Sequence, residues 1–303
     1  MSEQRARLFL PFGLLTAILA VSTASIFIRF AQREAPSLVI AALRLTVATL
    51  VLTPVALTRY RDELRRLKRG ELLLGLLSGV FLAVHFATWI TSLEYTSVAS
   101  SVVFVSTGPL WVALLAPIFL REPLTGKILA GMTLALLGGT VIGLGDACQL
   151  ENGLSCPPFS EFVRGKAIFG NFLALAGAWA VAGYLILGRR LRAGMSLIPY
   201  IFVVYGSAAV CLLLAMVGSG QSPAGFSPAT YTWIILLALV PQLIGHTTYN
   251  WALRYLPAAL VSITTLAEPV GSAILAYFIL QEVPSRLTLL GGVIILAGLY
   301  LAS

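Results

Sequence analysis

Ten apolar stretches, each near the length of a membrane-spanning helix, constrain this chain more than any other feature of its sequence. A bilayer core takes about 20 apolar residues in helical conformation. The stretches lack the alternation of apolar and polar residues found in β-barrel strands, so we expect helices. The predicted spans are residues 8–30, 38–57, 72–93, 98–120, 128–144, 167–187, 197–217, 231–253, 258–280 and 287–302. The sequence therefore predicts an all-α polytopic membrane protein with ten transmembrane helices.

The charged residues are few and unevenly distributed. They make up 11% of the chain, against roughly 25% in soluble domains, which excludes a soluble enzyme or a nucleic-acid-binding domain and predicts a lipid bilayer as the surroundings. If the N-terminus lies inside, 14 Lys and Arg residues fall in inside segments and 5 in outside segments. Basic residues cluster on the cytoplasmic side of membrane proteins, so we expect both termini to be cytoplasmic.

The second half of the chain repeats the first at an offset of 160 residues. Between positions 93–142 and 253–302 no gap is needed, and 13 of the 50 pairs are identical. Leu and Ala matches are common in apolar sequence, whereas paired Tyr, Pro, Glu and Gly residues are not. The informative pairs are Tyr95/Tyr255, Pro109/Pro269, Glu122/Glu282, Gly131/Gly291 and Gly138/Gly298.

The repeat predicts two inverted halves. We expect a first repeat over residues 1–145, a periplasmic loop over 146–166 and a second repeat over 167–303. Five helices are an odd number, so the second copy crosses the membrane in the opposite sense. Inverted repeats are typical of secondary transporters, in which two halves expose a central site alternately to each side. This pattern predicts transport of a small molecule without identifying it.

The third and eighth spans carry polar residues at helical spacing. Gln242, His246, Tyr249 and Asn250 share one helical face, and the repeat partner carries a second such set. Polar side chains in a membrane face other helices or a cavity, so these faces predict a substrate site. The alternative is hydrogen bonding between helices without substrate. The set in the third span is Ser78, His85, Trp89 and Ser92, with Trp89 a candidate for stacking on an aromatic substrate.

The fourth and ninth spans contain prolines at equivalent positions. Pro109 and Pro269 predict bends, and hence hinges near a midplane site. Glu268 lies within the ninth span, where it either binds a proton or a substrate amine or pairs with a basic side chain. Arg44 lies within the second span, where it extends to the membrane surface, forms a structural ion pair or binds a substrate carboxylate. Further candidates for the lining of the cavity are Ser100, Thr107, Trp179, Tyr184 and Thr265.

Residues between the spans have predicted structural roles. Cys148 and Cys156 lie in the loop predicted to be periplasmic, where they either form a disulfide or remain free thiols. Glu122 and Glu282 precede the fifth and tenth spans, where we expect them to stabilise helix N-termini.

Several chemistries have no motif in the sequence. There is no Walker A motif, which predicts no ATPase function in the chain, and none of the zinc or hydrolase signatures that would predict an enzyme. We therefore expect no catalytic residues, no metal, no cofactor, no nucleic-acid partner and no ATPase subunit.

Segments 92–142 and 252–303 resemble the two halves of the EamA family, part of the drug/metabolite transporter (DMT) superfamily. The resemblance rests on "LAEP" at 266–269, "L-x-E" at 280–282 and Gly-Gly at 291–292. It implies a basket-shaped fold of two five-helix repeats in the bacterial inner membrane. Within the superfamily the chain most resembles YddG-type exporters, which implies export of aromatic and other neutral amino acids. The alternative is export of another small metabolite or drug, such as a nucleoside or a cationic drug.

Overall fold

The computed structural model describes residues 3–147, 166–281, 283 and 286–302, and every regular element in these ranges is a helix. Cys148 and Cys156 lie outside the described residues. The first half contains α1 (Glu3–Ser22), α2 (Ala24–Ala31), α3 (Ser37–Arg59), α4 (Arg61–Arg65), α5 (Arg69–Ser92), α6 (Val98–Val105), α7 (Gly108–Phe119) and α8 (Gly126–Ala147). The second half contains α10 (Lys166–Arg192), α11 (Leu197–Gly218), α12 (Pro228–Leu237), η1 (Ala238–His246), α13 (Thr247–Ala252), α14 (Ala258–Thr264), η2 (Thr265–Ala267), α15 (Glu268–Leu275), η3 (Ala276–Leu280) and α16 (Arg286–Ala302).

Seven helical segments among the described residues are long and apolar enough to cross a membrane. They are Leu8–Ala31, Ser37–Arg59, Arg69–Ser92, Lys166–Arg192, Leu197–Gly218, Pro228–Ala252 and Ala258–Leu280. The predicted fourth, fifth and tenth spans contain shorter apolar helices, namely Gly108–Phe119, Gly126–Val141 and Leu289–Gly298. The fourth is short because the helix is interrupted between α6 and α7.

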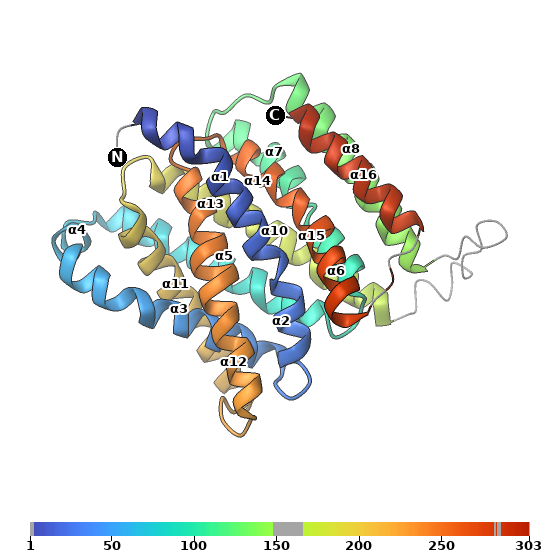
Figure 1. Cartoon of the computed structure of the whole chain (residues 1–303). Coiled ribbons are helices and arrows are strands. Elements are labelled where there is room, and N and C mark those ends of the chain that lie inside the picture. Colours follow the sequence, from blue (N-terminus) through green and yellow to red (C-terminus); the bar gives the residue numbers. More distant parts are fainter. Residues whose placement is uncertain (1–2, 148–165, 282, 284–285, 303) are drawn as a thin grey trace.

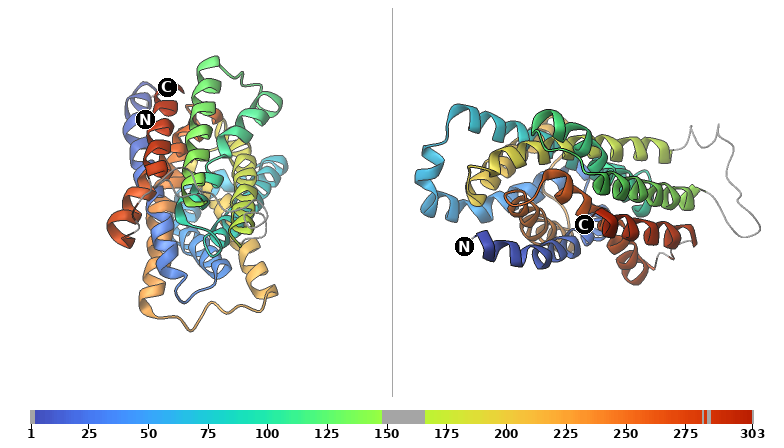
Figure 2. Two further views of the ribbon diagram at one scale, coloured as in Figure 1. Left: turned by 90° about the vertical axis from the view of Figure 1, so that its right-hand side faces the viewer. Right: turned by 90° about the horizontal axis from the view of Figure 1, so that it is seen from above.

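Each half of the chain packs its helices against those of the other half. The helix pairs α3–α11, α5–α10, α8–α16 and α1–η1 run alongside each other, and α6 and α7 contact α15 and α14. The α8–α16 pair lies at one side of the bundle, and α1 begins at the same end of the molecule at which α16 ends (Figures 1 and 2). The α8–α16 contact requires glycine, since a Cβ on Gly138 would lie 2.6 Å from the carbonyl oxygen of Gly291.

Two helices are interrupted at positions 160 residues apart. The helix that starts with α6 breaks at Ser106 and Thr107, and the helix that starts with α14 breaks at the 3₁₀ turn η2. Pro109 and Pro269 are each the second residue of the helix that follows the break. Proline is favoured there, because the first turn of a helix does not use its N–H groups. The prolines therefore begin new helices after a break instead of bending continuous ones.

Side-chain contacts at helix ends recur with the same offset. The Gln32 amide donates to the Ile90 carbonyl at 2.8 Å, and the Arg192 Nε donates to the Asn250 carbonyl at 3.0 Å. The two donor residues are 160 positions apart in the sequence, and so are the two acceptor residues. Each contact satisfies a carbonyl at the C-terminal end of a helix, where the last carbonyls lack partners within the helix.

Loop glutamates satisfy backbone N–H groups at the starts of helices that are distant in the sequence. Glu122 accepts from the Ala258 N–H at the start of α14 at 3.0 Å, so it binds a helix N-terminus as predicted, but that of α14 and not of the next helix in the chain, α8. Its loop lies closer to α14 in the tertiary structure than the sequence order suggests. Glu282 lies outside the described residues. Three more glutamates accept from the backbone N–H of a residue at or just before the start of a distant helix, namely Glu34 from Ser227, Glu63 from Ser196 and Glu94 from Ser37. Negative charge at helix starts is stabilising.

Candidate functional site

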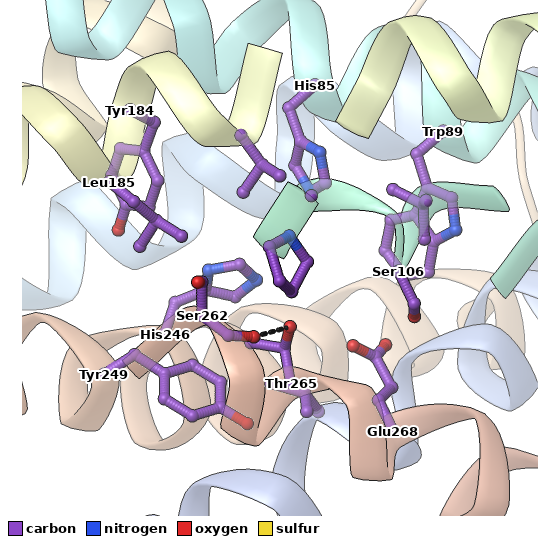
Figure 3. A pocket seen from close by; sticks show the side chains of 15 residues that line it. His85, Trp89, Ser106, Tyr184, Leu185, His246, Tyr249, Ser262, Thr265 and Glu268 are labelled. Atoms are coloured by element: carbon purple, nitrogen blue, oxygen red, sulfur yellow. Dashed lines mark hydrogen bonds between the residues drawn. The ribbon is translucent and has the colours of Figure 1, made fainter. Parts of the chain in front are cut away.

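A cavity of about 600 Å³, counting the space at its mouth, lies where the two interrupted helices meet α5, α10, η1 and α1. Figure 3 shows its lining. Both breaks contribute to it, through Ser106 and Gly108 on one side and Thr265 and Glu268 on the other.

Aromatic and imidazole rings form one wall of the cavity. The His85 and Trp89 rings stack with centroids 5.8 Å apart, and the His246 ring lies 6.3 Å from His85 and 6.4 Å from Tyr184. His85 Nδ1 lies 2.9 Å from the Gly177 carbonyl oxygen, which can only accept. His85 therefore donates through Nδ1, and when neutral it presents Nε2 as an acceptor. The wall offers ring faces and at least one hydrogen-bond acceptor.

Glu268 contributes a carboxyl group to the opposite wall. It is the first residue of α15, directly after the 3₁₀ break, and its side chain points toward the space that Trp89 and Ser106 face (Figure 3). In the described part of the chain Glu268 forms no ion pair within 4 Å. Its carboxyl group is therefore available to a ligand in the cavity.

The predicted polar face of the eighth span is divided between the cavity and the layer behind it. His246 and Tyr249 line the cavity, whereas Gln242 and Asn250 are buried away from it. The prediction of one shared face assumed regular α-helical turns. Residues 238–246 instead form the π-helix η1, which contains Pro241. Its wider turns change the direction of each side chain.

A polar layer lies behind the ring wall. Asn250 donates to the Tyr184 hydroxyl at 2.5 Å and to the Tyr205 hydroxyl at 3.3 Å. Ser78 Oγ lies 3.4 Å from the Tyr200 hydroxyl. Because Tyr184 also lines the cavity, this layer positions part of its wall.

Arg44 belongs to the same layer. Its Nε donates to Gln242 Oε1 at 3.1 Å, and its side chain is 0% exposed. The alternative that Arg44 extends to the membrane surface is therefore wrong. The guanidinium instead lies over the face of the Phe86 ring, 4.0 Å from its centroid.

Three residues predicted to line the cavity, Ser100, Thr107 and Trp179, are not among its lining residues. Ser100 donates to Asn171 at 3.2 Å, and Thr107 accepts a 3.4 Å hydrogen bond from the Trp111 indole. Trp179 is 44% exposed and packs edge-on against Trp111.

Sequence reasoning missed cavity residues that carry little polar signal. Ser106 lines the cavity directly before the break in the fourth span, and the motif Ser106-Thr107-Gly108-Pro109 could have indicated it. Val21, Val181 and Leu185 also line the cavity. These apolar residues resemble those that face lipid, so the sequence carries no signal that distinguishes them.

A bundle of membrane-spanning helices whose two halves enclose a partly polar cavity is the architecture of a small-molecule transporter. The model of the EamA-like transporter family matches residues 9–144 and 168–303, and the chain belongs to this family. It is a multi-pass membrane protein.

Several relatives are also named as transporters, and one solved structure shares the fold. Two uncharacterized transporters of Archaeoglobus fulgidus are 27% and 25% identical, over 95% and 75% of this chain and 93% and 73% of their own lengths. A probable terminal-alkyne amino-acid exporter of Streptantibioticus cattleyicolor is 25% identical over 65% of this chain and 61% of its own. A crystal structure superposes with a TM-score of 0.75 over 100% of this chain and 97% of that chain. At 20% identity the superposition shows the shared fold alone.

Proposed function

We propose that this protein is a secondary transporter that exports aromatic and other neutral amino acids by alternating access. In this proposal ten spans form two inverted five-helix repeats, 1–145 and 167–303, in a bacterial inner membrane with both termini cytoplasmic. The observation that carries the proposal is the position of the cavity. It lies where the interrupted helix of each half meets the other, so a movement of one half against the other changes access to it.

The recurrence of local geometry supports inverted repeats. Arg121 and Gln281, 160 residues apart, are described non-glycine residues with positive φ, at 56° and 58°. Residues other than glycine rarely adopt this conformation. Two occurrences at the repeat offset indicate that the halves share backbone geometry and not only composition. At the same offset, α1 corresponds to α10 and η1 corresponds to α5. The contact between α1 and η1 therefore has its equivalent in the contact between α10 and α5, as a two-fold relation between the halves requires.

The chemistry of the lining supports an amino-acid cargo. The carboxyl group of Glu268 and the acceptor of His85 suit an ammonium group, and the ring faces of Trp89 and His246 suit an aromatic side chain. The exporter of Streptantibioticus cattleyicolor, whose name gives an amino acid as its cargo, is a relative at low identity.

The test is counterflow of labelled L-phenylalanine into proteoliposomes that contain the purified protein. Unlabelled amino acids, nucleosides and cationic drugs compete in turn. We expect saturable exchange that neutral amino acids inhibit and that His246→Ala and Glu268→Gln reduce. Trp179→Ala, outside the described lining, is the matched control and should exchange like the unmodified protein.

Two outcomes would contradict the proposal. Absence of exchange in folded protein would exclude phenylalanine export. Inhibition by nucleosides or cationic drugs, but not by amino acids, would assign the same scaffold to a different cargo.

A further inference from the structure

Arg44 is a fully buried cation with unused hydrogen-bond donors. It lies about two turns into α3, is 0% exposed, and its Nη1 and Nη2 atoms have no hydrogen-bond partner. Only its Nε is used, in the 3.1 Å bond to Gln242. A guanidinium keeps its positive charge inside proteins. Buried charge is costly unless it is paired and hydrogen-bonded, so this site lacks an anion.

No described carboxyl group forms an ion pair with Arg44, although the charge of Glu268 acts on it from a longer distance. The carboxylate groups in the described part of the chain lie more than 4 Å away, and the ion pair among these residues joins Arg189 to Glu122. Gln242 offers only a neutral oxygen, and its own Nε2 is a further buried donor without a partner. The two Nη atoms of Arg44 are thus free to bind an acceptor with two oxygens.

Arg44 lies one side-chain layer behind the cavity. Its guanidinium covers the Phe86 ring at 4.0 Å, and the Phe86 ring contacts the His246 ring at a centroid distance of 5.3 Å. His246 lines the cavity. A ligand in the cavity can therefore reach the free nitrogens of Arg44 only if these two rings move aside. Glu268 lines the cavity (Figure 3), so a carboxyl group of the cavity and a buried cation one layer behind it are both near a bound ligand.

We propose that Arg44 recognises the carboxylate of the transported molecule. This inference rests on the proposed function and names its specificity determinant. The planar guanidinium fits a carboxylate with two parallel hydrogen bonds, a geometry that a lysine ammonium does not reproduce. Glu268 takes the ammonium group at the other end, so the preferred cargo is a zwitterion. Removal of the cargo's carboxylate charge should then weaken binding more than removal of its amine.

The experiment compares ligands that differ only at these groups. L-phenylalanine, L-phenylalaninamide and 3-phenylpropionate are tested as competitors of counterflow and as ligands that raise the thermal unfolding temperature of the detergent-purified protein. In the unmodified protein we expect the amide to bind about tenfold or more weakly than phenylalanine, the loss expected for hydrogen bonds to a charged group. Phenylpropionate, which lacks the amine that Glu268 would bind, should bind more weakly than phenylalanine but more tightly than the amide.

Variants at Arg44 test the assignment. Arg44→Gln should reduce the preference for the carboxylate over the amide to about twofold or less, and Arg44→Lys should keep part of it because the charge remains. Arg190→Gln, at an exposed arginine, is the matched control and should keep the full preference. If Arg44→Gln does not fold, the comparison of the three ligands in the unmodified protein and in Arg44→Lys shows whether Arg44 binds the carboxylate.

Several results would overturn the inference. One is equal binding of amide and acid to the unmodified protein, and another is an unchanged preference in folded Arg44→Gln. Stabilisation by chloride alone that equals stabilisation by phenylpropionate would assign Arg44 to an inorganic anion. If counterflow fails but phenylpropionate still stabilises the protein through Arg44, the cargo proposal fails while carboxylate recognition stands.

Discussion

Arg189 and Glu122 form an ion pair with 2.6 Å between Nε and Oε1, and the pair joins the two halves of the protein at one end of the bundle. Arg189 also donates to the Leu253 carbonyl at 2.7 Å, while Glu122 accepts from the Ala258 N–H at 3.0 Å. The pair therefore holds the end of α10, the loop after α7 and the start of α14 together. With 25% and 18% of the side chains exposed, it is shielded more than a surface pair.

Loss of this ion pair should lower stability. We expect Glu122→Ala to reduce the free energy of unfolding by about 1–3 kcal/mol, because charged hydrogen bonds are lost and the Ala258 N–H loses its acceptor. Denaturant unfolding in detergent gives the value. A double-mutant cycle with Arg189→Met should show coupling, whereas the same cycle with Arg190→Met should show none. Additive effects in the first cycle would contradict an energetic link.

The contact between α5 and α11 should not tolerate a side chain at Gly79. A Cβ there would lie 2.6 Å from the Val204 carbonyl oxygen and 2.5 Å from the Ser207 Cβ. Backbone cannot move aside cheaply, so Gly79→Ala should destabilise the protein by about 1–3 kcal/mol. Gly206→Ala is the control, since the nearest atom is at 3.6 Å. Equal unfolding temperatures for the two variants would disprove this close approach.

The contact that joins Glu34 to the start of α12 should depend on pH. Glu34 accepts from the Ser227 N–H at 2.8 Å and from the Thr230 hydroxyl at 2.9 Å. These hydrogen bonds lower the pKa of Glu34 below its ordinary value of 4.5, led by the backbone N–H of Ser227. The stabilisation is complete above pH 4.5 and disappears as the pH falls through the lowered pKa.

Glu34→Gln removes this charge. The unfolding temperature of the unmodified protein should exceed that of Glu34→Gln at pH 7, and the difference should shrink as the pH falls below the ordinary pKa of 4.5. A difference that stays constant down to the lowest pH at which both remain folded would rule out charge as its cause.

Trp89 should favour aromatic cargo. It lines the cavity and stacks on His85, and aromatic pairs contribute about 0.5–1.5 kcal/mol beyond burial. Trp89→Ala should therefore lower the preference for phenylalanine over leucine by about 2- to 12-fold in counterflow competition. Trp179→Ala should leave it unchanged. If both substitutions alter the preference equally, the selectivity does not arise at the ring wall.

The sequence predicted the helical class because apolar run length is a local property. Of the predicted spans, the fourth shows the limit of this reasoning. Its composition is continuous from 98 to 120, yet the helix breaks at Ser106 and Thr107. The 160-residue offset was visible in the sequence as identical pairs, and Pro109 and Pro269 marked the two breaks.

The sequence by itself determined the helical membrane class, the internal repeat and many of the polar residues near the cavity, because burial of polar groups in lipid limits where they can occur. Only the tertiary structure decided which of them face the cavity. The π-helix η1 separates His246 from Gln242 on a face that regular spacing would unite. Packing of α3 against η1 places Arg44 beside Gln242 and Phe86 instead of at the membrane surface. Side-chain direction depends on helix geometry and on contacts 198 residues apart in the chain, and no local pattern encodes these.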